Sequence, residues 1–325
     1  MNLADVADQL LEVSVVPSFT RVGFDVRSRL DRWEAPQGDL AGHTIVVTGA
    51  TSGLGRQAAQ ELAMLGAHVV LCGRDRAKAE RVRTELSAYT GSTELSVACA
   101  DMGRLDQVRQ MVDDIVTAHP KLDGLVHNAG ALAAQRSENA AGIEMTVASQ
   151  VLGPFLLTGS LLPTLSDARP GRVVTVSSGG MYTARVDVEH LEMEPTDYRG
   201  SEQYARAKRA QVTLNEMWAE RVPRASVVFH ALHPGWADTP GIESALPRFR
   251  RVLRPLLRTP AQGVDTLLWL MVDDGDPVHT SGMFWHDRRR RAIHRLPSTR
   301  RSDTPERRRA LWDWCVAQTG VGAVA

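Results

Sequence analysis

The stretch that decides the fold reads Thr48-Gly49-Ala50-Thr51-Ser52-Gly53-Leu54-Gly55. An apolar, strand-like run (Thr44–Thr48) leads into it, and a helical pattern (Arg56–Leu65) closed by Gly66 follows. Glycines permit positive φ and close backbone approach, and the free N–H groups at a helix N-terminus favour a phosphate. An isolated glycine motif would be an ordinary turn, but this strand–turn–helix context predicts a dinucleotide site.

Strand-like runs and helical patterns alternate along the chain. The strand-like runs are Thr44–Thr48, His68–Gly73, Glu94–Ala98, Gly124–His127, Arg172–Ser177, Ser226–Ala231 and Gly282–Trp285. The helical stretches are Arg56–Leu65, Ala77–Tyr89, Leu105–Ala118, Gly142–Leu162, Glu202–Ala219 and Ala261–Val272. Such alternation with right-handed crossovers predicts an α/β fold, a Rossmann-type doubly wound parallel sheet of about seven strands with helices on both faces.

Residues 1–40 precede this pattern and are predicted to form a helical extension and a linker. Apolar residues from Leu3 to Val13 have helical spacing, and Pro17 stops the run. We expect these helices to pack on the core or on a partner. Peripheral contact with a membrane is the alternative, weakened by acidic residues in the same segment. Residues 41–325 are predicted to form a single domain with an arginine-rich C-terminal tail.

The charge balance argues against a nucleic-acid partner. The 325 residues are 43% hydrophobic, enough for a large core, and carry a formal net charge of zero. Arginines do cluster near the C-terminus, at Arg288–Arg291 and Arg307–Arg309. Asp303 and Glu306 interrupt them and no aromatic stacking platform accompanies them, so we expect a solvated tail.

The cysteines and the N-terminus favour a cytoplasmic location. Cys72, Cys99 and Cys315 lack metal-ligand spacing, so no metal site is predicted. Cys72 and Cys99 lie in or next to strand-like runs and are expected to be buried thiols in a reducing compartment. The start, Met1–Asp5, does not resemble a secretory signal, and no segment approaches about 18 uninterrupted apolar residues, so no spanning helix is expected.

A second motif, Tyr204-Ala205-Arg206-Ala207-Lys208, lies downstream of the glycine turn. Four residues make about one helical turn, so Tyr204 and Lys208 lie on one helix face. An ammonium beside a phenol stabilises the phenolate and lowers the tyrosine pKa, as acid/base work near neutral pH requires. Such a pair alone is usually chance on an exposed helix, but its conjunction with the glycine turn favours a functional role.

Residues at the ends of strands complete a nucleotide site. Arg74 follows the second strand and suits a 2′-phosphate, which favours NADP(H), although the neighbouring Asp75 keeps NAD(H) as an alternative. Asp101 ends the third strand and is expected either to accept from the adenine amino group or to cap the next helix. In Asn128-Ala129-Gly130 the asparagine is expected to bridge backbones, while the small residues leave room for the ribose.

Together these residues resemble the short-chain dehydrogenase/reductase superfamily. The matching features, in family order over roughly residues 43–290, are the glycine motif at 48–55, Asn-Ala-Gly at 128–130, Ser177-Ser178, Tyr-x-x-x-Lys at 204–208, and Pro234-Gly235 with Thr239. The runs Ser177–Met181 and His233–Gly241 are similar to the group called dehydrogenase/reductase member 12, over nearly the whole chain. The resemblance implies an oxidoreductase that moves a hydride between nicotinamide and a carbonyl or alcohol carbon, and a homo-oligomer.

The resemblance also implies roles for single residues. Tyr204 would be the general acid in reduction, Lys208 would lower its pKa and hold the nicotinamide ribose, and Ser178 would hydrogen-bond the substrate oxygen. Thr239 would contact the nicotinamide carboxamide. The cofactor-binding set is Gly49, Thr51, Ser52, Gly53, Leu54, Gly55, Arg74, Asp101, Asn128, Ala129, Gly130, Tyr204, Lys208, Pro234, Gly235 and Thr239.

Two positions depart from the family pattern. Gln150 stands where many members have a catalytic asparagine. It either holds the water that links the lysine to solvent, as a fourth catalytic residue, or weakens the proton relay. His127 also replaces an asparagine, and we expect it to be structural and satisfied by backbone groups.

The substrate is expected to be a lipophilic carbonyl or alcohol. The segment after Gly235 carries apolar anchors, including Trp236 and Phe249, among arginines that keep a lid soluble. The alternative is an NADP(H)-binding sensor or scaffold with weak or no catalysis. Gln150 motivates that alternative, and the intact trio of serine, tyrosine and lysine argues against it.

Overall fold

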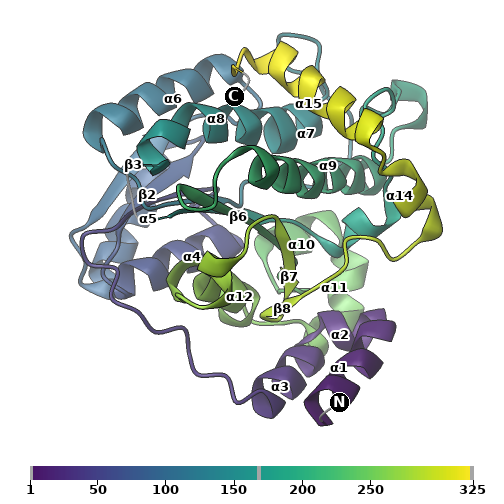
Figure 1. The fold of residues 1–325 in the computed structure, drawn as a ribbon. Helices are drawn as coiled ribbons and strands as arrows, with labels where there is room; N and C mark the ends of the chain where they lie inside the picture. The colour runs from purple at the N-terminus through teal and green to yellow at the C-terminus, as the bar shows by residue number, and fades with distance from the viewer. Residues whose placement is uncertain (1–2, 167–169, 323–325) are drawn as a thin grey trace.

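The fold is built around one eight-stranded sheet, seen in a computed structural model that describes residues 3–166 and 170–322 (Figure 1). The strands are β1 (Thr44–Thr48), β2 (His68–Gly73), β3 (Leu95–Cys99), β4 (Gly124–His127), β5 (Gly171–Val176), β6 (Val227–Leu232), β7 (Met283–His286) and β8 (Arg289–Arg290). Their order is β3-β2-β1-β4-β5-β6-β7-β8. The first seven pair in parallel and β8 pairs antiparallel with β7. The predicted doubly wound α/β fold is confirmed.

Helices cover both faces of the sheet and bury two apolar cores. One core lies under α4 (Gly53–Met64), α5 (Arg76–Thr90) and α12 (Pro260–Val272). The other lies under α6 (Leu105–Ala118), α8 (Gly153–Ser166) and α9 (Gly200–Arg221), with α15 (Pro305–Thr319) packed outside them. The shorter helices are α1 (Leu3–Val13), α2 (Val15–Phe19), α3 (Arg21–Leu30), α7 (Met145–Val147), α10 (Pro240–Ala245), α11 (Pro247–Leu253), α13 (Asp276–His279) and α14 (Pro297–Ser302).

The site is positioned by the reversal of strand order at β1. From β1 the chain winds outward to β2 and β3, then crosses back to β4, which pairs with the other side of β1. In a parallel sheet all carboxyl ends meet at one edge, and ligands bind where the winding reverses. The loops after β1 and β4 therefore face each other across a crevice.

The structure differs from the predictions in two elements and in the burial of one cysteine. The eighth strand, Arg289–Arg290, was not predicted because two charged residues carry no strand pattern. The predicted helix Gly142–Leu162 instead begins at Met145, because Gly142 has φ +78°, and it passes through a π-helical turn at Ala148–Leu152. Cys99 is half-buried rather than buried, since β3 is an edge strand.

Within the described residues, one helical run, Met145–Ser166, is long and apolar enough by composition to cross a membrane. Most of it is buried in the larger core between the sheet and its neighbouring helices. Its apolar character therefore fits a core helix of this fold.

The N-terminal extension folds back onto the turn between β7 and β8, as the lower right of Figure 1 shows. Its anchor is Arg27 on α3, which is 1% exposed. Arg27 Nε lies 2.7 Å from Asp8 Oδ1, and its Nη1 lies 2.7 Å from Asp287 Oδ2. Arg258, also buried, donates through Nη2 to the same Asp287 oxygen at 2.8 Å. One carboxylate thus bridges two buried guanidinium groups from distant parts of the chain.

The expectation of a solvated tail is wrong for the arginines that directly follow β7, whereas Arg307 and Arg309 are exposed as expected. Arg291 Nη1 lies 2.7 Å from Asp8, Arg289 Nη2 lies 2.7 Å from Asp31, and Arg295 pairs with Glu12. The acidic partners belong to the N-terminal extension and lie far from the arginines in the sequence, so the arginine run by itself did not indicate these ion pairs. Burial alone would raise the pKa of Asp8, but its hydrogen bonds and charge contacts with Arg291 and Arg27 lower it to about 2.

The variant Asp287→Asn should lower the free energy of unfolding by about 3–5 kcal/mol, because it leaves two buried guanidinium groups without their shared charge. Denaturant unfolding followed by circular dichroism measures this. The matched control is Asp276→Asn, whose ion pair with Arg290 is about half-exposed and should contribute less than about 1 kcal/mol. Equal effects of the two variants would contradict a structural role for the buried cluster.

Candidate cofactor and active site

A cavity of about 580 Å³ opens at the carboxyl ends of the strands. Every predicted cofactor-binding residue except Gly55 lines it. The residues that line it from the predicted motifs are Gly49, Thr51, Ser52, Gly53, Leu54, Arg74, Asp101, Asn128, Ala129, Gly130, Ser178, Tyr204, Lys208, Pro234, Gly235 and Thr239. Residues spread over nearly two hundred positions of sequence therefore surround one space.

The glycine turn between β1 and α4 packs tightly against the loop after β4. Gly49 has φ +67°, and a side chain at Gly55 would overlap both the Gly49 carbonyl and the Asn128 amide. Gly55 thus supports the turn from behind instead of facing the cavity. Asn128 Nδ2 donates to the Thr48 carbonyl oxygen at 3.0 Å, so the asparagine bridges two backbones as expected. The first N–H groups of α4 are left beside the cavity, as an anion site requires.

The far end of the nucleotide crevice is basic. Arg74 is exposed and lines the cavity together with Lys78. Lys78 was not predicted from the sequence. Asp75, the residue that kept NAD(H) open, instead accepts from the Lys78 backbone N–H at 3.0 Å and caps α5. Asp101 accepts from the Gly103 backbone N–H at 2.9 Å, one residue before the cap of α6, while it also lines the cavity. The expectation that Asp101 caps this helix is therefore wrong, because the N-cap of α6 is Arg104, and the position of Asp101 at the cavity is compatible with the adenine contact.

Tyr204 and Lys208 project from α9 into the cavity. Lys208 Nζ lies 5.3 Å from the centroid of the Tyr204 ring. The ammonium donates to the Val176 carbonyl oxygen at 3.0 Å and to Gln211 Oε1 at 2.9 Å. Tyr204 forms a hydrogen bond with Ser178, whose Oγ also accepts from the Gly180 backbone N–H at 3.2 Å.

The expectation that the lysine lowers the tyrosine pKa is not met in this arrangement. Burial raises the pKa of Tyr204 to about 12, against the opposing effect of its hydrogen bond with Ser178. Burial also lowers the pKa of Lys208 to about 7. The phenolate form of Tyr204 and the ammonium form of Lys208 both lose hydration in the crevice. The ammonium also donates its hydrogen bonds to acceptors other than the tyrosine. At neutral pH the phenol is therefore protonated and can donate.

Gln150 lies beside this pair, in the π-helical turn before α8, a deviation often found at functional sites. It is 1% exposed, and its Nε2 donates to the Ala131 carbonyl oxygen at 2.8 Å. Its Oε1 is buried without a partner among the described residues, and a side chain at Gly130 would contact both this oxygen and Lys208 Nζ. Gln150 does not line the cavity itself, and its free acceptor lies behind Gly130, near Lys208.

His127 is structural, but its partner differs from the expected one. Its Nε2 pairs with the Thr158 hydroxyl at 2.7 Å rather than with backbone. Burial, with a smaller effect from the charge of Lys208, lowers its pKa to about 3, so the ring is neutral. The backbone expectation was wrong because the sequence could not show that α8 passes behind β4.

The end of the cavity next to Ser178 is supported by residues that the sequence did not predict to be part of the site. Gly235 has φ +74°, and a side chain there would overlap the guanidinium of Arg258. His233 Nδ1 accepts from the Gly179 backbone N–H at 3.2 Å, next to Ser178. Phe19 of the extension packs edge-on against His233, with ring centroids 4.2 Å apart. The only sequence signal for this contact was a large aromatic at the end of a short helix.

The apolar part of the cavity comes from the segment after β6. Trp236, Ile242, Leu246 and Phe249 line it, as expected for apolar anchors near a substrate. Between Ser178 and Tyr204, the side chains of Tyr182, Leu191 and Met193 are buried in the interior and do not line the cavity. Thr239 accepts from the Ile242 backbone N–H at 3.4 Å and so caps α10 at the cavity edge.

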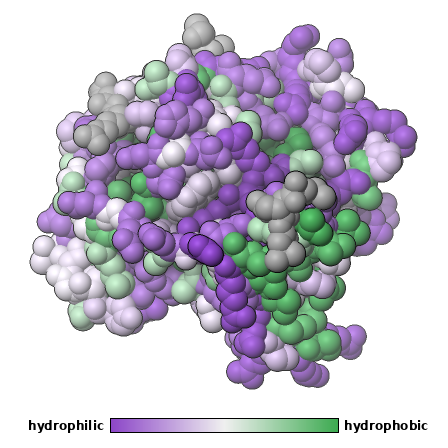
Figure 2. All heavy atoms as spheres, turned by 60° about the horizontal axis from the view of Figure 1, so that its bottom comes forward, coloured by the Kyte–Doolittle hydropathy of each residue, from purple (hydrophilic) through white to green (hydrophobic). Residues whose placement is uncertain are grey.

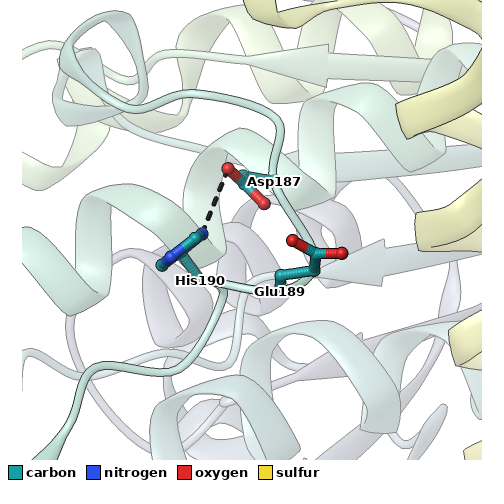
Figure 3. A group of neighbouring side chains, drawn as sticks. All are labelled: Asp187, Glu189 and His190. Atoms are coloured by element: carbon teal, nitrogen blue, oxygen red, sulfur yellow. Dashed lines mark ion pairs between the residues drawn. The ribbon is translucent and has the colours of Figure 1, made fainter.

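One group of potential metal ligands occurs among the described residues: Asp187, Glu189 and His190, on the loop before α9 (Figure 3). Their ligand atoms lie within 4.8 Å of one another, and two of the three side chains are exposed. His190 Nδ1 lies 3.3 Å from Asp187, and Arg307 Nη1 lies 3.7 Å from the same carboxylate. Since a guanidinium already supplies positive charge there, this group carries no argument for a metal.

The crevice fits a nicotinamide dinucleotide. It has a glycine turn at a helix N-terminus, basic side chains at the far end, and a tyrosine–lysine–serine trio at the other end. A phenol that donates a proton next to a ribose-sized space can serve hydride transfer to or from a carbonyl carbon.

A family model described as short chain dehydrogenase matches residues 43–247. The chain therefore belongs to the short-chain dehydrogenase/reductase superfamily, oxidoreductases with an NAD(P)-binding Rossmann fold.

Named relatives refine this assignment. The chain is 37% identical to human dehydrogenase/reductase SDR family member 12 over 266 residues, which cover 82% of this chain and 83% of the relative. The expected likeness to that group is confirmed. Mouse retinol dehydrogenase 11 is 31% identical over 73% of this chain and 75% of its own length. A solved short chain dehydrogenase from Shigella flexneri, complexed with NADP, is 27% identical, with a TM-score of 0.63 over 78% of this chain and all of that one.

Proposed function

We propose that the protein is an NADP(H)-dependent oxidoreductase that transfers a hydride between the nicotinamide and the carbonyl or alcohol carbon of a lipophilic substrate. The convergence of Tyr204, Lys208 and Ser178 on the cavity that the glycine turn lines carries this proposal. Family membership supports the reaction class, and the basic pair Arg74 and Lys78 supports the choice of cofactor.

The cofactor supplies or accepts the hydride when bound, and the chain positions it. The turn at 49–55 and the N-terminus of α4 would hold the pyrophosphate, and Asp101 the adenine. Asn128-Ala129-Gly130 would border the ribose, with Lys208 as its hydrogen-bond partner. Pro234-Gly235 and Thr239 would hold the nicotinamide end.

The proton would move through Tyr204. Ser178 would orient the substrate oxygen, and the neutral phenol would donate to it as the carbonyl is reduced. A pKa of about 12 keeps the phenol protonated at neutral pH, so it can act as the proton donor when a carbonyl is reduced. Gln150, with its buried acceptor oxygen, would occupy the relay position beside Lys208.

The variant Tyr204→Phe should lower kcat by about 10²–10⁴-fold, since it removes the proton donor while it keeps the ring. NADPH binding should persist, as fluorescence titration can show. Tyr89→Phe, at a 69% exposed position, is the matched control and should keep full activity. Tight NADPH binding with no turnover by the wild type over a broad carbonyl panel would instead favour the sensor or scaffold.

The preference for NADP(H) depends on Arg74. A charge-assisted contact with a 2′-phosphate contributes roughly 1.5–3 kcal/mol, so Arg74→Ala should weaken NADPH binding by about 10–100-fold and leave NADH binding nearly unchanged. Parallel fluorescence titrations measure both. Arg83→Ala, on the helix α5 that follows Arg74 and paired with Glu80 at 2.8 Å, should change neither. Equal affinities of the wild type for NADPH and NADH would contradict the preference.

The lipophilic substrate is inferred from Trp236, Ile242, Leu246 and Phe249 in the cavity wall. The name of the retinol dehydrogenase relative points to an apolar alcohol in that protein. Across a series of straight-chain aldehydes, kcat/KM should rise about threefold to fourfold per added methylene until the cavity is filled, at ~0.8 kcal/mol each. A flat series would contradict an apolar substrate site without affecting the assignment of the cofactor.

Two expectations from the sequence remain proposals. A cytoplasmic location agrees with the free thiols of Cys72 and Cys315, both buried. Homo-oligomeric assembly rests on the family resemblance, and size-exclusion chromatography with light scattering would measure it.

A further inference from the structure

The N-terminal helices present their apolar side chains to solvent. On α1, Val6, Leu10 and Val13 are 38%, 70% and 88% exposed, and on α2, Val15 and Val16 are 46% and 44% exposed. Figure 2, which turns the bottom of Figure 1 toward the viewer, shows hydrophobic residues gathered on this face at lower right. A contiguous exposed apolar patch indicates an interaction surface, whereas scattered apolar residues do not.

The charged side of α1 faces inward, the reverse of an ordinary surface helix. Asp8 and Glu12 contact buried Arg27, and Asp5 pairs with Arg289 at 3.3 Å. The acidic residues that weakened the membrane alternative at the sequence level are thus engaged with the protein's own arginines. The outer side of α1 therefore carries Val6, Leu10 and Val13, with Gln9 as an exposed polar side chain among them.

Basic residues lie next to this apolar face. On α3, Arg21 and Arg29 are exposed beside Val22, which is 40% exposed. On α11, Arg248 and Arg251 are exposed beside Val252, which is 75% exposed.

A chain of aromatic contacts joins α11 to α2. The Phe19 ring lies 5.7 Å from Trp236, and Trp236 lies 4.9 Å from Phe249, measured between ring centroids. The exposed parts of α1–α3 and α11, which we call the N-terminal face, therefore belong to one region of the molecule.

We propose that the N-terminal face docks on an anionic lipid bilayer, with the apolar side chains of α1 and α2 in the interface and the arginines of α3 and α11 on the lipid headgroups. Exposed apolar residues flanked by arginine are the composition that interfacial binding requires. A second copy fits less well, because a two-fold contact through this face would bring like-charged arginines together.

This placement also serves the proposed function, on which this part of the inference rests. Leu246 and Phe249, at the ends of α10 and within α11, line the cavity. The same short segment thus contributes to the cavity wall and to the lipid-facing surface. A lipophilic substrate dissolved in the bilayer would reach the cavity without crossing water.

The test is co-sedimentation of the full-length protein with vesicles of phosphatidylcholine, alone or mixed with phosphatidylserine. The wild type should bind the mixed vesicles. The double variant Leu10→Ser/Val13→Ser should bind them at least about tenfold more weakly, because it removes the most exposed apolar side chains. The variant Tyr89→Ser, at a 69% exposed position outside the face, is the matched control and should bind like the wild type.

Charge is tested separately with Arg248→Gln/Arg251→Gln. This variant should lose about fivefold in binding per arginine on phosphatidylserine vesicles, and the loss should diminish as salt is raised. Absence of wild-type binding, or binding that Leu10→Ser/Val13→Ser leaves unchanged, would overturn the proposal. A wild-type dimer in light scattering that the same double variant makes monomeric would assign the face to a second copy instead.

The docking proposal and the enzymatic proposal can be refuted independently of each other. Reduction of a short, water-soluble aldehyde should be unchanged in Leu10→Ser/Val13→Ser, because neither residue lines the cavity. Vesicle binding without any turnover would refute the enzyme and retain the docking surface, whereas turnover without vesicle binding would do the opposite.

Discussion

The buried carboxylate of Asp287 is the contact on which the arrangement of the site's outer half depends. It lies between the guanidinium groups of Arg27 and Arg258, all about 1% exposed. Attraction in a poorly hydrated interior is strong only when every partner is present, so this cluster has a single stable geometry. Arg258 in turn donates to the carbonyl oxygens of Ser18 and Thr20 and lies under Gly235. The extension, the last strands and the nicotinamide loop are therefore held together by one charge network.

This network makes the extension part of the active-site scaffold. Phe19 packs on the loop that carries His233, and a side chain at Gly179 would contact the Phe19 ring at 2.6 Å. The backbone of Trp236 donates to the Phe19 carbonyl oxygen at 2.7 Å. The turn after Ser178 and the loop after β6 therefore share one aromatic support from outside the Rossmann core. The charge network also explains why the apolar side of α1 faces outward. The acidic side of the helix must face inward to form the ion pairs.

Loss of hydration determines the pKa shifts of Tyr204 and Lys208 inside the crevice. Burial raises the pKa of the tyrosine and lowers that of the lysine, so the pair as folded is a neutral proton donor beside a weakly basic amine. The charge effect of the lysine on the tyrosine, which the four-residue spacing predicted, does not lower the tyrosine pKa here. Gln150 adds a buried acceptor near the lysine that has no partner among the described residues.

Sequence alone determined the seven parallel strands and the motifs that line the cavity. Periodicity placed the seven parallel strands within a residue, because alternation and turn residues are local properties of the chain. The glycine turn, Asn128 and the pair Tyr204 and Lys208 were identifiable because their chemistry depends on short spacings. Tertiary structure decided whatever depends on partners distant in sequence: Thr158 for His127, Asp8 for Arg291, and Phe19 beneath the active site. Charge pairing and desolvation act through space, so only the folded chain shows which arginines are neutralised and which apolar face remains uncovered.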